Sequence, residues 1–78
     1  MTLRVEFTIE PFVAGAPGPH VLAAVDAAGA HGLAVEFGPF GSSGEGADAD
    51  VLPAVDAAIR AALAAGATRV SVQISRLD

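Results

Sequence analysis

The period of the hydrophobic pattern changes several times along this 78-residue chain. Side chains alternate between two faces in a strand, whereas they return to one face every three or four residues in a helix. Apolar and polar residues alternate in segments 3–10, 33–37 and 69–75, which predicts strands there. Segments 19–31 and 51–65 repeat apolar residues at helical spacing, which predicts helices.

The first alternating segment predicts a half-buried strand that ends at Pro11, because proline cannot donate to a strand ladder. Its inward residues are Leu3, Val5, Phe7 and Ile9, and its outward residues are Arg4, Glu6, Thr8 and Glu10. The last strand repeats the pattern, with Val70, Val72 and Ile74 facing inward. In the strand between them, Leu33, Val35 and Phe37 are expected to face inward, with Ala34 and Glu36 outward.

The first helix is expected to begin at Pro19, where the missing N–H costs nothing, and to end near His31. Gly32 can adopt the left-handed cap conformation. The residues expected to form its buried stripe are Val21, Leu22, Val25 and Ala28.

For the second helix, Asp50 is the better N-cap than Asp48, because Pro53 then falls in the first turn. Gly66 is expected to end it. The predicted buried face consists of Leu52, Val55, Ile59 and Leu63 (or Ala62), and Asp56 and Arg60 form an exposed i,i+4 pair.

If residues 42–46 supply a short strand, the order of elements is that of an α+β, ferredoxin-like βαββαβ sandwich. We therefore predict a single domain, residues 1–78, in which two helices cover one face of an antiparallel sheet. The uncovered face would meet water or another subunit. It would display Glu6, Thr8, Glu10, Ser71, Gln73 and Ser75, together with Arg4 and Arg69.

Charge and composition exclude several function classes. The net charge of −5 and four scattered arginines argue against nucleic-acid binding, which needs clustered positive charge. No apolar stretch reaches the ~20 residues that span a bilayer, so we expect no membrane insertion. The absence of cysteine rules out disulfides and thiolate-bound metals and suits a cytoplasmic protein. A chain this short has a marginal core, which self-association would relieve.

Few residues offer catalytic chemistry. His20 and His31 lie at opposite ends of the first predicted helix, ~16 Å apart, so they cannot share a metal and are read as structural. Ser42 and Ser43 have no histidine nearby in the sequence and no nucleophile elbow. The glycines at 41, 44 and 46 do not match a phosphate-binding loop. We therefore expect no enzyme activity and no cofactor.

The segment 41–46 instead suggests ligand binding, because glycine lets a backbone approach a small molecule closely. Ser42, Ser43 and Glu45 supply hydroxyls and a carboxylate there; the alternative interpretation is a flexible hairpin turn. Glu10 and Phe12 lie where the first strand ends, close to the position that a ferredoxin-like topology gives the 40–46 hairpin with Phe40. A carboxylate beside aromatic rings would receive a flat, amine-bearing or cationic ring.

Four pieces of sequence resemble the thiamine-binding-protein (YkoF-like) family. They are Val5–Pro11 in the opening strand, Gly32–Ser42, the pair Glu45–Gly46, and Gly66–Val70 before the last strand. The resemblance implies a ferredoxin-like sheet, assembly into dimers or tetramers through sheet faces and edges, and binding of thiamine or its hydroxymethylpyrimidine half.

Family members are not established enzymes. The resemblance assigns ligand binding to Ser42 and Glu45, with Glu10 and Phe40 as neighbours, whereas Ser43 and Gly44 stand where the family usually has aliphatic residues. We therefore predict a non-catalytic, ligand-binding homodimer or homotetramer. The alternative is a structural or regulatory assembly module with no small-molecule ligand.

Overall fold

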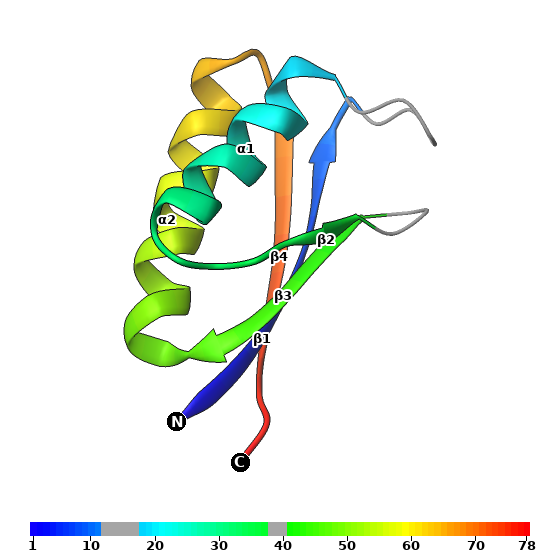
Figure 1. Ribbon diagram of the computed structural model, residues 1–78. Coiled ribbons are helices and arrows are strands. Elements are labelled where there is room, and N and C mark those ends of the chain that lie inside the picture. The colour runs from blue at the N-terminus through cyan, green and yellow to red at the C-terminus, as the bar shows by residue number, and fades with distance from the viewer. Residues whose placement is uncertain (12–17, 38–40) are drawn as a thin grey trace.

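A computed structural model describes residues 1–11, 18–37 and 41–78. These residues form a four-stranded antiparallel sheet in the order β2-β3-β1-β4, with two helices on one side (Figure 1). This is the predicted ferredoxin-like α+β sandwich. The elements are β1 (Thr2–Glu10), α1 (Pro19–Ala30), β2 (Glu36–Phe37), β3 (Ser42–Ala47), α2 (Asp48–Ala64) and β4 (Arg69–Arg76).

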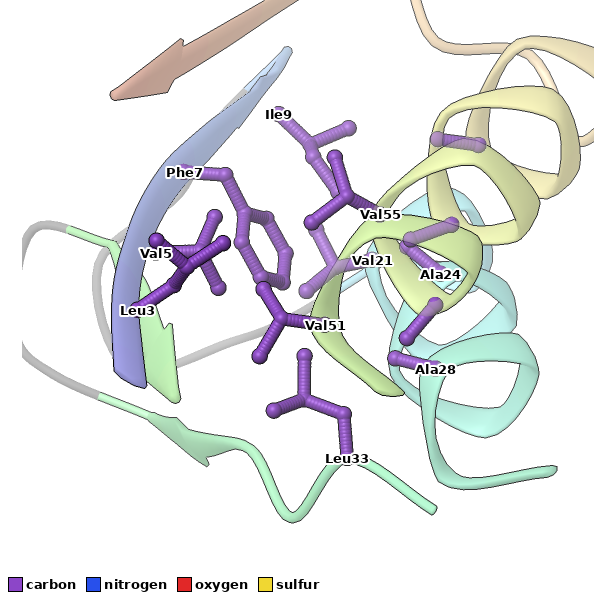
Figure 2. Packing of buried hydrophobic residues seen from close by; sticks show 13 residues of the cluster. Leu3, Val5, Phe7, Ile9, Val21, Ala24, Ala28, Leu33, Val51 and Val55 are labelled. Atoms are coloured by element: carbon purple, nitrogen blue, oxygen red, sulfur yellow. The ribbon is translucent and has the colours of Figure 1, made fainter. Parts of the chain in front are cut away.

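The central strand β1 decides which side chains enter the core. Directly paired residues of neighbouring strands face the same side of a sheet. Phe7 pairs with Ser42 of β3 and with Val72 of β4, so these three positions face the helices. Figure 2 shows Phe7, Val51 and Leu33 converging between the sheet and the helices. The four inward residues predicted for β1 are all buried: Leu3, Val5, Phe7 and Ile9.

The helices bury mostly alanine, which corrects part of the prediction. α1 and α2 lie side by side (Figure 1), and small side chains let two helices approach closely. Leu22, Leu52 and Leu63 are exposed, because the alanine-rich faces beside these leucines make the close contact instead. The residues that the helices do bury are His20, Val21, Ala24 and Ala28 in α1, and Val51, Ala54, Val55, Ala58 and Ala62 in α2.

The helix ends follow the predicted signals except at the start of α2, because α2 ends just before Gly66, which has a left-handed φ of 106°. Pro19 begins α1, and Gly32 takes a left-handed φ of 86° just after its end. α2 begins at Asp48 rather than after Asp50, and it contains Pro53. The N-terminus replaces the expected cap, since the Asp48 N–H donates to the Met1 carbonyl over 2.9 Å. The backbone bond that Pro53 cannot donate belongs to an exposed early turn, where water can replace it.

β2 is shorter than the predicted strand 33–37, because residues 33 and 34 lie against the covered side of β3. Leu33 is only 2% exposed and fills the space above Gly44. A Cβ atom at Gly44 would come within 2.9 Å of the Ala34 carbonyl oxygen and 3.0 Å of Leu33 Cδ1. Glycine at this position therefore gives the connection room to reach β2.

Candidate functional site

The sheet face opposite the helices is polar, and its side chains come from four strands. Register places four glutamates and two arginines there, giving a formal charge of 2 − 4 = −2. We call this surface the open face. Its residues are Glu36 of β2, Ser43 and Glu45 of β3, Arg4, Glu6, Thr8 and Glu10 of β1, and Arg69, Ser71, Gln73 and Ser75 of β4.

A broad depression of about 610 Å³ lies over the middle of the open face. Gly41 helps to shape one end of it, because a Cβ atom there would come within 3.0 Å of both the Phe7 carbonyl oxygen and Thr8 Oγ1. The start of β3 can therefore lie close to β1. The depression is lined by Arg4, Glu6, Phe7, Thr8, Gly41, Ser42, Ser43, Ser71, Val72 and Gln73.

Arg4 holds two carboxylates at the border of the depression. Its Nε donates to Glu6 Oε1 over 3.0 Å, and its Nη1 donates to Glu45 Oε2 over 2.8 Å. These hydrogen bonds, first that to Glu6 and then that to Glu45, raise the pKa of Arg4. One guanidinium shared between two carboxylates leaves this cluster with a net negative formal charge. A bound anion would have to compete with both carboxylates for Arg4.

The two glutamates proposed from sequence lie at opposite ends of the open face. Glu45 pairs with Arg4, so it lies six β1 positions from Glu10. At about 3.3 Å per strand residue the two sites are ~20 Å apart. Glu10 instead faces Arg69, with 3.5 Å between Oε2 and Nε. One small ring therefore cannot contact both carboxylates.

The two neighbouring serines face opposite sides of the sheet. Ser43 pairs with Glu6 and faces the depression, whereas Ser42 pairs with Phe7 and is buried on the helix side. Successive side chains of a strand alternate between faces, so only one of the two hydroxyls can reach a ligand on the open face. The remaining candidates, Phe12 and Phe40, lie outside the described residues.

Sequence reasoning placed Glu6, Ser71 and Gln73 on the uncovered face but did not select them as site residues. Strand alternation could have identified all three, because it turns them to the same outward face of two adjacent strands. Glu6 pairs with Gln73, and Thr8 pairs with Ser71. Strand alternation alone does not show where on this face the depression lies.

The histidines hold structural positions away from the open face. His20 is buried, and its Nε2 lies 2.6 Å from the Pro11 carbonyl oxygen, which ties the start of α1 to the end of β1. His31 is the C-cap residue of α1. Within the described residues, no three histidine, aspartate or glutamate side chains cluster as a metal site would require. Neither described helix is long and apolar enough to cross a membrane.

Comparison with known proteins reveals similarity at the level of structure. No family model matches the sequence. No significant sequence match to a curated protein was found. Among solved structures, a domain of unknown function (DUF77) from Bacillus cereus superposes with a TM-score of 0.66 at 25% identity, over 95% of this chain and 72% of that one. A hypothetical protein of Methanocaldococcus jannascii gives 0.68 at 26% identity, over 99% of this chain and 82% of that one.

A third structure carries a functional name. It is a proposed thiamine biosynthesis/salvage protein from Thermotoga maritima, with a TM-score of 0.52 and 19% identity, covering 96% of this chain and 81% of that one. At this identity the likeness shows a shared fold alone. All three comparisons agree with the ferredoxin-like architecture of the described residues.

Proposed function

We propose that this protein binds a small, flat, amine-bearing or cationic ligand, thiamine or its hydroxymethylpyrimidine half, without catalysing its conversion. We also propose that the protein acts as a self-associated assembly. The observation that carries the ligand proposal is the depression on the open face, a space of about 610 Å³ lined by the Glu6 carboxylate, by Arg4 and by uncharged hydroxyl and amide groups. This volume falls within the range of about 300–1,000 Å³ that is typical of small-molecule sites.

The groups in the depression complement an aminopyrimidine. The Glu6 carboxylate can accept a hydrogen bond from an exocyclic amine, a charge-assisted contact when the ring is protonated. Hydroxyls of Ser43 and Ser71 can donate to ring nitrogens, and the Gln73 amide can donate and accept. The negative formal charge of the open face also attracts the positive thiazolium ring of thiamine.

Two further observations support this choice of ligand. Four sequence segments resemble the thiamine-binding-protein family, and the fold is shared with a protein proposed to act in thiamine biosynthesis or salvage. Arg4 is already bonded to Glu6 and Glu45, which disfavours an anionic ligand. Of the residues predicted from sequence, Ser43 keeps its proposed contact, whereas the Ser42 side chain is buried on the helix side. Glu6 replaces Glu10, because Glu10 does not line the depression.

Isothermal titration with thiamine and with hydroxymethylpyrimidine tests the proposal. We expect Glu6→Gln to weaken thiamine binding by about 10-fold or more, because a hydrogen bond to a charged group is lost. Glu10→Gln is the matched control, since it removes an equivalent β1 carboxylate four residues, or ~13 Å, further along the same strand.

The titrations show both whether the protein binds a ligand and where on the open face the ligand lies. Failure of wild-type protein to bind either compound at millimolar concentration would refute the ligand proposal. Binding that is lost in Glu10→Gln but kept in Glu6→Gln would place the site at the opposite end of the open face.

A second candidate function is a structural or regulatory assembly module. Exposed Leu52, Leu63 and Ile74 favour it, because large aliphatic side chains on α2 and β4 suit contact with another chain. This function predicts an assembly that forms normally while both titrations show no heat of binding.

A further inference from the structure

Arg4 supplies the positive charge at the border of the depression. Among the residues that the structure describes, it is the only basic side chain that lines this space. An arginine side chain keeps its charge in proteins, and its planar guanidinium binds phosphate through two parallel hydrogen bonds. Without competing partners, Arg4 would therefore attract a phosphorylated ligand into the depression.

Two carboxylates occupy donors on both binding edges of this guanidinium. An oxyanion can bind side-on, to Nε and Nη2, or end-on, to Nη1 and Nη2. The Arg4 Nε donates to Glu6 Oε1 over 3.0 Å, which takes one donor of the side-on edge. The Nη1 donates to Glu45 Oε2 over 2.8 Å, which takes one donor of the end-on edge. A phosphate group can reach two donors of Arg4 only by displacing one of these carboxylates.

The two carboxylates differ in their position relative to the depression. Glu6 pairs with Ser43 and lines the depression, where it is proposed to accept a hydrogen bond from the ligand amine. Glu45 pairs directly with Arg4, and it does not line the depression. Glu45 is therefore placed to act on a ligand through Arg4 rather than by direct contact.

We propose that Glu45 is a specificity-determining residue, which blocks phosphate binding by Arg4 and makes the depression select an unphosphorylated ligand over its phosphate ester. The inference rests on the proposed function, since thiamine and hydroxymethylpyrimidine each carry a hydroxyl group that can be phosphorylated. It goes further, because it assigns the choice between these two chemical forms to a residue outside the depression. Glu45 makes this choice by holding Nη1 and by offsetting the charge of Arg4.

Formal charges account for the direction of the selection. Arg4, Glu6 and Glu45 together carry 1 − 2 = −1, so a phosphate group that approaches this cluster meets net repulsion. Without the Glu45 carboxylate the sum is 1 − 1 = 0, and Glu45 no longer occupies the end-on edge of the guanidinium. Removal of Glu45 therefore changes both the charge and the donors that a phosphate group meets, and it leaves the Glu6 carboxylate for the ligand amine.

The exposure of the ion pair limits the size of the effect. The Arg4 side chain is 38% exposed and that of Glu45 is 52% exposed, so water weakens their attraction. Exposed ion pairs of this kind change an equilibrium constant by about 5-fold or less. We therefore expect Glu45 to contribute a factor of about 5 to the preference for the unphosphorylated ligand, and we expect salt to reduce this factor.

Isothermal titration of thiamine and of thiamine monophosphate tests the inference, and the measured quantity is the ratio of their two dissociation constants. A general loss of affinity cancels in this ratio. We expect wild-type protein to bind thiamine more tightly by about 5-fold or more, and Glu45→Gln to reduce this preference by about 5-fold. Salt at about 0.5 M should reduce the wild-type preference as well, because it screens exposed charges.

Glu10→Gln is the matched control for the loss of one negative charge from the open face. Glu10 faces Arg69, with 3.5 Å between Oε2 and Nε, and neither residue lines the depression. The preference of this variant is expected to stay within about 2-fold of wild type, because exposed charges at this distance are screened. Circular dichroism checks folding, and Glu45→Thr serves as a second variant because threonine favours strands.

Each outcome of the titrations decides a different point. A preference that falls in the Glu45 variants alone supports the inference. An unchanged preference in these variants, or equal binding of both compounds by wild-type protein, overturns it and leaves thiamine binding in place. An equal fall in Glu10→Gln also overturns it, because the effect would then belong to the net charge of the open face. Wild-type protein that does not bind thiamine overturns the proposed function and the inference together.

Discussion

Replacement of Gly44 by alanine is expected to lower the free energy of unfolding by about 2 kcal/mol, the usual cost of overpacking. The new Cβ atom would lie 2.9 Å from the Ala34 carbonyl oxygen and 3.0 Å from Leu33 Cδ1. The Leu33 side chain can shift, but the backbone carbonyl cannot move without displacing the connection to β2. For a chain of this length the total stability is about 4–12 kcal/mol, so urea denaturation will detect this loss readily.

Gly46→Ala is the matched control on the same strand and the same face. Its Cβ atom would lie 3.4 Å from Val51 Cγ2, an ordinary contact, so its effect is expected to stay within about 0.5 kcal/mol. Adding Leu33→Ala to Gly44→Ala should give a double mutant more stable than the summed single effects predict, although Ala34 still prevents full relief. Equal stability of the Gly44 and Gly46 variants would contradict this account of the short β2.

Enlargement of Ala24 to leucine is expected to cost about 3 kcal/mol or to prevent folding. Ala24 is 0% exposed on the alanine-rich side of α1, and the core offers no exposed route for a longer side chain. The helices would have to separate, which would also loosen the contact of α2 with β1. Chemical denaturation followed by circular dichroism measures the change.

Ala30→Leu is the control for the second prediction. Ala30 is the exposed last residue of α1, and leucine and alanine have similar helix propensities. Its stability is therefore expected to remain within about 0.5 kcal/mol of wild type. If Ala24→Leu proves equally harmless, the close approach of the two helices through alanine is wrong.

The first prediction also concerns the candidate site. Gly44 lies between Ser43 and Glu45 on β3, and its lack of a side chain lets Leu33 press against the covered side of the strand. A displaced β3 would move the Ser43 hydroxyl and the carboxylate that bonds to Arg4. Ligand affinity should therefore fall together with stability in Gly44→Ala, whereas Gly46→Ala should preserve both.

The sequence was sufficient to predict the order of elements and the inward face of β1. Both depend on local periodicity: Leu3 and Val5 face the core because alternation is a property of any strand. The helix signals at Pro19 and Gly32 are equally local, since each acts through its own backbone geometry. The polar character of the open face followed from the same alternation.

The tertiary structure decided everything that depends on distance between elements. Both helices carry two stripes at helical spacing, and the close contact between them selected the alanine-rich stripe over Leu52 and Leu63. Strand register brought Arg4 to Glu45 and separated Glu45 from Glu10, and the pleat turned Ser42 toward the core. No local pattern encodes these choices, because they arise from how the strands and helices pack around one shared core.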